Sequence, residues 1–320
     1  MKISLKNVSR EDWLKLRKTG IGGSDAGAIC GVNSYRSAGD VYLDKISDEI
    51  SETDNEAMRQ GRDLEDYCAR RFIEETGLKV KRSNFIYRSE EHPFMLANVD
   101  RVILGENAGV ECKTCSAFSS DQWNNGAVPE SYQIQCQHYM SVMGWAYMYI
   151  ACVILGKGFI YQKLDRDDRL IEGLIAIEQD FWNGHVQKHV MPRPDGSKAY
   201  DSILNHLYPE GKKESTIPLL GFDFDLQRRE ELSELIEKME AERNEIDQKI
   251  KQFMQDNETA ESSRYKVNWK TIEACRLDMK RFKAEEPALY EKYLRHIFSR
   301  RFTVKAQPIL ELPKMLFSAA

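Results

Sequence analysis

The sequence predicts an α/β protein with a central mixed sheet flanked by helices, followed by a smaller, mainly helical C-terminal region. Two observations support this fold class. β-Forming runs alternate with amphipathic helices as far as about residue 190, and a long charged helix follows a proline-rich break. At 320 residues the chain has room for a large domain and an appendage. We therefore divide it into residues 1–195 and 196–320.

The N-terminal part begins with a helix capped by Ser9 and ended by Gly20. Residues 19–25 are rich in glycine, which lets backbone amides approach a phosphate, and Ser24 can add a hydroxyl there. A plain tight turn is the alternative, because the Gly-Lys-Ser/Thr of a Walker motif is missing. Further helices are predicted over 37–46 and 57–76, the second closed by Gly77.

The helix over 57–76 carries an acid in an unusual position. Leu64, Cys68 and Phe72 form an apolar stripe, and Glu65 lies against this stripe rather than opposite it. A carboxylate placed there needs a partner or a nearby metal if it is buried. An ion pair with Arg62, Arg70 or Arg71 is the structural alternative.

An acidic hairpin forms the centre of the predicted sheet. After a strand over 79–88, the segments 94–104 and 110–114 pair across a turn at 105–109. Side chains two apart on a strand share a face, so Glu111 and Lys113 point the same way and Asp100 can reach that face. Two carboxylates and an ammonium suit a magnesium ion and the hydrolysis of a phosphodiester. A solvated charged hairpin is the alternative in a chain that is 30% charged.

A helix over 130–143, opened by Pro129, has Gln133, Gln135 and Gln137 in its first half, where they can line a site at the end of the sheet. A second hairpin over 146–164 and a helix over 169–190 follow. Residues 191–218 are predicted to be a linker or loose loop.

The C-terminal region is dominated by a predicted helix over 225–255. In it Leu232, Met239, Ile246 and Phe253 recur every seven residues, which favours packing within the chain, with an oligomer contact as the alternative. The remaining predictions are a short strand within 265–272, two helices split by Pro287, and a β-rich run over 297–304.

Composition limits the class of protein. The chain has no run of about 18 apolar residues and no apolar signal segment at its start, so we expect a soluble, intracellular protein. Seven scattered cysteines fit a reducing compartment, and Cys112 and Cys115 lack the second pair that a zinc site needs. With a net charge of −5, any DNA contact must be local. Its candidates, which can also form an ordinary solvated face, are Arg59, Arg62, Lys79, Lys81, Arg82 and Lys157.

Several motifs occur together in an order that resembles a known family. They are Arg17, Gly-Ile-Gly-Gly-Ser-Asp at 20–25, Gly-Arg-Asp-Leu-Glu at 61–65, Asn-Val-Asp at 98–100, Glu-Cys-Lys at 111–113 and Gln-x-Gln-His-Tyr at 135–139. From about residue 8 to 190 the chain resembles the YqaJ-type viral recombinases. That family is similar to the phage lambda exonuclease, of the PD-(D/E)XK nuclease superfamily. The segments 265–270 and 300–302 also look like tails of phage members.

The resemblance implies a restriction-endonuclease-like core and a role for each matched residue. Asp100 and Glu111 would bind Mg²⁺, or Mn²⁺ as a substitute, with the backbone carbonyl of Cys112. Lys113 would act on the attacking water or the developing charge, and Glu65 would complete the site through water or a second metal. Val99 stands where the superfamily has its proline. Three residues would grip a terminal 5′-phosphate: Arg17, Ser24 and Gln137, with Gln135 as the alternative to the last.

The function implied by this resemblance is a magnesium-dependent 5′-to-3′ exonuclease that resects linear double-stranded DNA for phage-type recombination. Its implied partners are DNA ends, a single-strand annealing protein and further copies of the chain in a ring-shaped trimer. We expect it in the cytoplasm of a bacterial host, with a phage or prophage origin. The alternatives are an endonuclease or nickase on the same fold, and a catalytically silent DNA-binding scaffold.

Overall fold

A computed structural model describes residues 1–48, 55–296 and 299–306, in two compact units. The first unit spans Met1–Tyr208 and the second begins at Pro209. No helix in these described ranges is both long and apolar enough to cross a membrane.

The main sheet of the first unit is mixed, as predicted. Strands β7 and β8 run parallel, whereas every other neighbouring pair in this sheet is antiparallel. A parallel pair needs a crossover connection, which is supplied here by α5 (Glu130–Met143). The strand order across the sheet is β3 (Val80–Arg82), β6 (Arg101–Ile103), β7 (Gly109–Cys115), β8 (Tyr147–Ile154), β9 (Gly158–Asp165).

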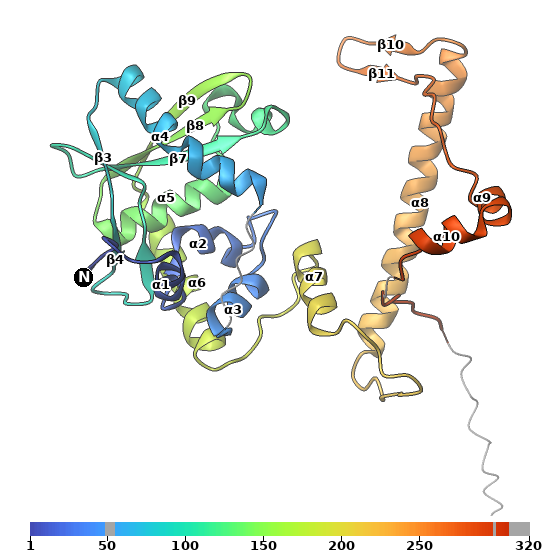
Figure 1. Cartoon of the computed structure of the whole chain (residues 1–320), viewed down its shortest axis with the longest axis horizontal. Coiled ribbons are helices and arrows are strands. Elements are labelled where there is room, and N and C mark those ends of the chain that lie inside the picture. The colour runs from blue at the N-terminus through green and yellow to red at the C-terminus, as the bar shows by residue number, and fades with distance from the viewer. Residues whose placement is uncertain (49–54, 297–298, 307–320) are drawn as a thin grey trace, which may run out of the picture. The chain divides into compact units, whose positions relative to one another are not determined.

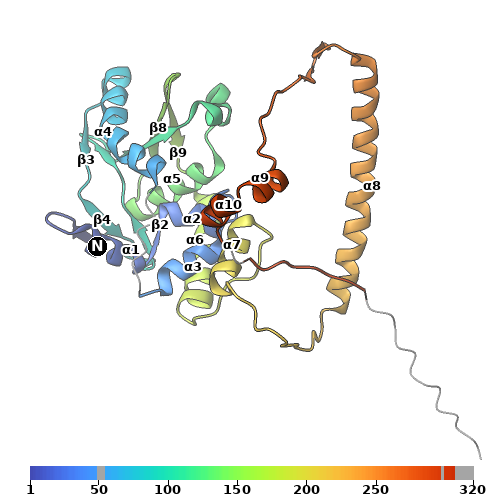
Figure 2. The same cartoon turned by 45° about the vertical axis from the view of Figure 1, so that its right-hand side comes forward.

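Helices cover both faces of this sheet (Figures 1 and 2). On one face, Cys68 and Phe72 of α4 (Glu56–Thr76) are fully buried in a core cluster with residues of β7 and β8. On the other face, Cys136 and Met140 of α5 are fully buried against β8. The apolar stripe predicted on α4 is therefore its core face.

A second, smaller sheet corrects two strand predictions. β4 (Phe85–Arg88) and β5 (Met95–Ala97) pair with each other and, at the two edges, with β1 (Lys2–Ser4) and β2 (Ile21–Gly22). The continuous strands predicted over 79–88 and 94–104 are wrong, since each is divided between the two sheets. At the crossing the backbone N–H of Ser83 donates to the carbonyl of Asp100 at 3.0 Å. Asp100 thus lies where the chain passes from one sheet to the other.

Most predicted helices of the first unit are confirmed, including the caps at Ser9 and Gly77, and Ser37 is the N-cap of α3. The helix predicted over 169–190 ends early, because α6 stops at Phe181 and a π-helical turn, Trp182–Val186, follows. A 3₁₀-helical stretch over Ala117–Gly126 leads from β7 to α5. The bounds of the other helices are α1 (Arg10–Lys18), α2 (Gly23–Ile29), α3 (Ala38–Ile46) and α6 (Asp168–Phe181).

The loop predicted over 191–218 contains a helix, α7 (Lys198–Leu207). Its buried Tyr200 and Ile203 pack so tightly on α3 that a Cβ added to Gly39 would come within 2.8 Å of the Ile203 side chain. The first unit therefore continues to Tyr208 rather than ending at residue 195.

The second unit is mainly helical. Its elements are α8 (Asp223–Met254), the antiparallel hairpin of β10 (Thr259–Glu261) and β11 (Lys266–Asn268), α9 (Met279–Glu285) and α10 (Pro287–Tyr293). The heptad residues of α8 are 43–84% exposed, so no described element of the second unit covers them, and their packing within the chain stays a prediction. Of the β-rich run predicted over 297–304, residues 297–298 lie outside the described ranges, and 299–304 form no strand.

Candidate active site

A cavity of about 210 Å³ brings together residues that are far apart in the sequence. It lies where α1, the β2–α2 junction, the acidic hairpin and α5 meet. The predicted residues that line it are Arg17, Ser24, Asp100, Glu111, Lys113 and Gln135. The predicted meeting of Asp100 with the Glu111–Lys113 face is thus present in the structure.

The β6–β7 hairpin fixes Asp100 at one end of this cavity. Arg101 pairs with Val110 in the ladder, so Asp100 lies beside the start of β7. There its Oδ2 accepts a hydrogen bond of 2.8 Å from the backbone N–H of Cys112. Burial and the nearby charges of Glu111 and Glu65 raise the pKa of Asp100 well above its usual range.

Glu111 is the most confined acid of the cavity. Its Oε1 accepts hydrogen bonds from Lys113 Nζ at 2.9 Å and Gln135 Nε2 at 2.6 Å. Its Oε2 is buried and has no hydrogen-bond partner among the described residues. A buried carboxylate oxygen without a donor is costly, and such groups are rare in folded proteins.

These two acids fit a divalent cation. A cation between them would satisfy the orphaned oxygen of Glu111 and favour the ionised form of Asp100, whose pKa is otherwise raised. In the described ranges, no group of three or more His, Cys, Asp or Glu side chains is arranged to hold a metal. Two carboxylates with water and backbone ligands are a set that suits Mg²⁺.

Lys113 is held as a charged ammonium. Burial by itself lowers the pKa of Lys113, but the charges of Glu111, Tyr132 and Asp100 and the hydrogen bond to Glu111 together outweigh it, and the net pKa is raised above the usual value. Lys113 Nζ also donates to Gln135 Oε1 at 2.9 Å and lies 4.6 Å from the centre of the Tyr132 ring. A fixed positive charge of this kind can stabilise negative charge that develops on a reacting phosphate.

Arg17 and Ser24 form the opposite side of the cavity. Arg17 Nη2 donates to Ser24 Oγ at 2.9 Å, and the guanidinium lies 5.0 Å from the centre of the Trp13 ring. Gly23 lets this turn approach α5, because a Cβ there would come within 2.5 Å of Tyr139. The glycine-rich segment is thus a close-packed wall of the cavity.

Asp25 anchors that wall, and sequence reasoning missed it. This fully buried carboxylate accepts hydrogen bonds from Lys45 Nζ at 2.7 Å, Arg36 Nη1 at 2.9 Å and the Gly22 backbone at 3.0 Å. Lys45 also donates to the backbone carbonyl of Arg17 at 3.0 Å. Burial alone would raise the pKa of Asp25, but the charges of Lys45, Arg36 and Arg17 hold it far below its usual range.

Glu65 lies beside this cavity but does not line it. Its carboxylate pairs with Arg82 at 3.1 Å and with Arg101, whose side chain is almost fully buried. It is close enough to Asp100 for its charge to raise the pKa of that carboxyl. The acid on the apolar stripe of α4 therefore has arginine partners from β3 and β6.

The structure does not bring Gln137, predicted to contact the phosphate, to the cavity. Gln137 Nε2 donates to the carbonyl of Asp165 at 2.9 Å, and its Oε1 accepts from the backbone of Asp167 at 3.0 Å. Both ends of the amide thus hold the junction between β9 and α6. Gln135, the alternative, faces the cavity instead.

The candidate DNA-contacting cations are partly engaged within the chain. Arg82 pairs with Glu65, Arg59 lies 3.8 Å from Asp63, and Lys157 donates to Ser120. These contacts favour the structural interpretation for those three residues.

Comparison with known proteins gives one family. Residues 12–146 match the model of the YqaJ-like viral recombinase domain. A relative from Bacillus subtilis (strain 168), named uncharacterized protein YqaJ, is 37% identical over 302 residues, which cover 93% of this chain and 95% of the relative.

Two crystal structures also resemble the chain. An alkaline exonuclease from Laribacter hongkongensis is 18% identical, with a TM-score of 0.48, over 62% of this chain and all of that one. A phage-related exonuclease from Haemophilus somnus 129PT is 14% identical, with a TM-score of 0.42, over 55% of this chain and 99% of that one.

Proposed function

The chain belongs to the YqaJ-like viral recombinase family, and from this premise we propose that it is a metal-dependent deoxyribonuclease whose active site is the cavity described above. The observation that carries the proposal is the meeting, in one cavity, of an acidic pair, a lysine and an arginine–serine pair. The acidic pair and the lysine suit metal-assisted hydrolysis of a phosphodiester, and the arginine–serine pair suits recognition of a second phosphate.

Asp100 and Glu111 would hold the metal, with the backbone carbonyl of Cys112 as a further ligand. Bound there, Mg²⁺ or Mn²⁺ would supply Lewis acidity and lower the pKa of the attacking water. The unpartnered Oε2 of Glu111 supports this assignment. Glu65 would act from outside the cavity, through water or a second metal.

Lys113 would stabilise the negative charge that develops on the cleaved phosphate, because its ammonium is kept charged beside Glu111. Gln135 would position it, since this amide bonds to both Lys113 and Glu111. Cleavage itself would thus rest on Asp100, just before β6, and on two residues of β7 whose side chains are held by Gln135 of α5.

Arg17 and Ser24 would bind the 5′-phosphate of a DNA end. Because they share the cavity with the acidic pair, a terminal phosphate held by them would set which bond meets the metal. This arrangement supports a 5′-to-3′ exonuclease on linear duplex DNA. That it works with a single-strand annealing protein and assembles as a ring-shaped trimer is proposed from the family resemblance alone.

The test is digestion of linear duplex DNA labelled at the 5′ or 3′ end, with and without a 5′-phosphate, in Mg²⁺. Lys113→Ala and Glu111→Ala should lose cleavage by several orders of magnitude while remaining folded. Lys163→Ala, which removes a half-exposed lysine from β9, is the matched control and should cleave normally.

A closed circular duplex distinguishes the alternatives, because an exonuclease needs a free end. Arg17→Ala should reduce the preference for phosphorylated 5′ ends more than it reduces cleavage of unphosphorylated ends. Near-normal activity of Lys113→Ala would refute the active-site assignment. Rapid cleavage of the circle would identify an endonuclease, and tight DNA binding without any cleavage would identify a silent scaffold.

A further inference from the structure

Charge is segregated along the second unit. Helix α8 carries ten aspartates and glutamates against six lysines and arginines. Residues 259–305, which we call the basic segment, carry twelve lysines and arginines against six acids. A locally basic segment in a chain of net charge −5 has the electrostatic character of a polyanion-binding surface.

The basic segment also exposes aromatic side chains. Within the described residues these are Tyr265, Trp269, Tyr293 and Phe302, with exposed fractions of 74%, 46%, 71% and 82%. Each has a lysine or arginine as a direct neighbour in the sequence. Exposed aromatic rings interleaved with cations are the combination that proteins use to bind single-stranded nucleic acid.

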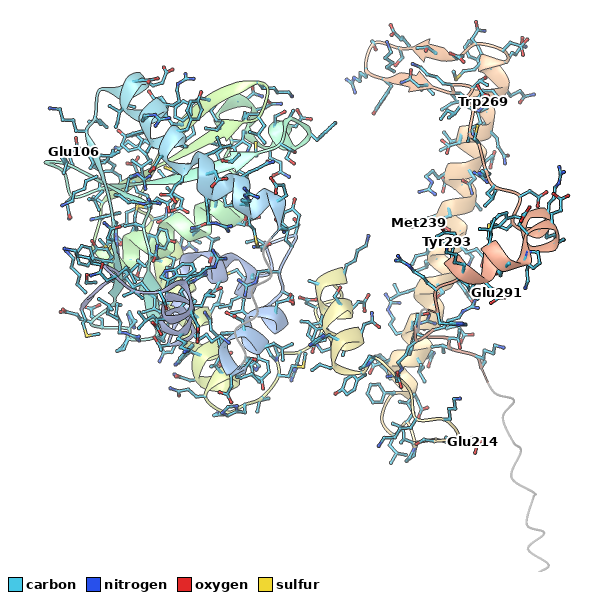
Figure 3. All side chains as sticks on the ribbon, in the orientation of Figure 1. Glu106, Glu214, Met239, Trp269, Glu291 and Tyr293 are labelled. Carbon is cyan, nitrogen blue, oxygen red and sulfur yellow. The ribbon has the colours of Figure 1, made fainter. Side chains whose placement is uncertain are left out.

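The β10–β11 hairpin holds two of these rings in a defined frame. Its ladder continues beyond the strands, since Ser262 N donates to Tyr265 O and Trp269 N donates to Glu258 O, both at 2.8 Å. Side chains alternate along such an extended segment, so Tyr265 and Trp269 project from the same face. Figure 3 labels Trp269 where the hairpin meets the end of α8.

Cations flank both rings. Arg264 precedes Tyr265 and Lys270 follows Trp269; both are exposed, and neither forms an ion pair within the part of the chain that is described. A two-stranded hairpin is narrow, so the long side chains of Arg264 and Lys270 can reach past its edge to the phosphates of a polynucleotide whose bases stack on the two rings.

We propose that the basic segment binds single-stranded DNA, with Tyr265 and Trp269 stacking on bases and Arg264 and Lys270 contacting phosphates. The proposal deepens the proposed function and rests on it, because resection of a duplex leaves a single strand for this surface to bind. Exposed rings favour a single strand over a duplex, whose bases are already stacked. They also favour it over an acidic protein, which would need the cations alone.

The test measures binding of fluorescein-labelled dT30 to the full chain by anisotropy, in EDTA so that no cleavage occurs. Trp269→Ala should weaken binding about tenfold and leave the salt dependence unchanged, because stacking releases no counterions. Lys270→Gln should reduce the slope of log Kd against log salt by about 0.7, the value for one phosphate contact on a single strand. Trp269→Phe, which keeps a ring, should bind almost normally.

α8 provides matched controls. Phe224 is 78% exposed but lies between Asp223 and Asp225, and Lys238 is an exposed lysine of the same acidic helix. Phe224→Ala and Lys238→Gln should leave dT30 binding unchanged. Circular dichroism of each variant checks that the helices are intact.

Two results would overturn the proposal. In the first, dT30 binding does not change in either Trp269→Ala or Lys270→Gln. In the second, Lys270→Gln weakens binding, Trp269→Ala does not, and blunt duplex binds as tightly as dT30, which would indicate a surface for anions in general, including acidic proteins. Because the assay needs no metal, its outcome is independent of cleavage by Asp100, Glu111 and Lys113.

Discussion

Replacing Asp25 with asparagine tests whether the anchor of the cavity wall is electrostatic. Asp25 and Lys45 have side chains with no exposed surface, and their charged atoms lie 2.7 Å apart. Removing one member of a buried ion pair costs about 3–5 kcal/mol, because the other charge is left uncompensated. Since most domains are stable by about 5–15 kcal/mol, Asp25→Asn should lose a large part of the stability of the first unit.

The assay is urea unfolding at pH 7, followed by tryptophan fluorescence in a Trp269→Phe background. Four of the five tryptophans then remain, and all four belong to the first unit. Asp44→Asn is the matched control, because Asp44 is half-exposed and its carboxylate lies 3.7 Å from the same Lys45 Nζ. Because the Asp44 carboxylate is accessible to water and its contacts with Lys45 and Arg36 are longer, its loss should cost only about 0–1 kcal/mol.

The pH dependence gives a second check. Because the folded-state pKa of Asp25 lies below its unfolded value, its contribution is complete above the unfolded pKa of about 3.9 and is lost as pH falls through the folded pKa. The difference between wild type and Asp25→Asn should therefore be constant from about pH 5 to pH 8 and shrink in more acidic solution.

A rescue variant completes the test. Adding Lys45→Met to Asp25→Asn replaces the uncompensated ammonium with an apolar side chain and should recover part of the lost stability. An electrostatic role for Asp25 is refuted if Asp25→Asn lowers the free energy of unfolding no more than Asp44→Asn does. It is also refuted if adding Lys45→Met lowers the free energy of unfolding of Asp25→Asn by as much as Lys45→Met alone lowers that of the wild type.

Three further predictions concern the cavity. Gln135→Leu should reduce the initial rate of cleavage about 10–100-fold with little change in melting temperature, because the amide positions Lys113 and Glu111. Gly23→Ala should lower both the melting temperature and the rate of cleavage, because the added Cβ would lie 2.5 Å from Tyr139. Gly61→Ala in α4 is the control, since open space surrounds its added Cβ, and it should stabilise the protein by about 0.5–1 kcal/mol. Mg²⁺ affinity, measured by titration calorimetry at several pH values, should weaken as pH falls through the raised pKa of Asp100. This loss of affinity should begin at a pH above the usual titration range of aspartate. Constant affinity from pH 8 to pH 5 would contradict the prediction.

The local signals in the sequence were sufficient for most of the helices. Ser9, Ser37 and Gly77 occupy the capping positions that their residue types favour, and α8 begins and ends within two residues of the predicted bounds. The strands over 79–104 could not be divided correctly, because each half has β-forming residues and the break depends on which sheet the half joins. That choice is made by long-range pairs, such as β1 with β4, which local pattern does not encode.

The meeting of Asp100, Glu111 and Lys113 was predictable because strand alternation and a short turn determine it within fifteen residues. The partners of Glu65 were not, since Arg82 and Arg101 come from strands whose register on α4 depends on tertiary packing. Asp25 had a local signal that sequence reasoning passed over. It stands three residues after Gly22, the spacing at which an acid bonds back to the N-cap of a helix.

Helix geometry could have shown from the sequence that Gln135, and not Gln137, shares a face with Tyr139. Residues two apart on an α-helix lie about 200° apart around its axis, so Gln135 and Gln137 cannot face the same cavity. Gln135 and Tyr139 are four apart and share a face, and Gln135 Nε2 lies 3.2 Å from Tyr139 Oη. Tyr139 in turn lies where a Cβ on Gly23 would be. Gly23 of α2 therefore packs on the face of α5 that carries Gln135 and Tyr139, and Gln137 lies on a different face of that helix.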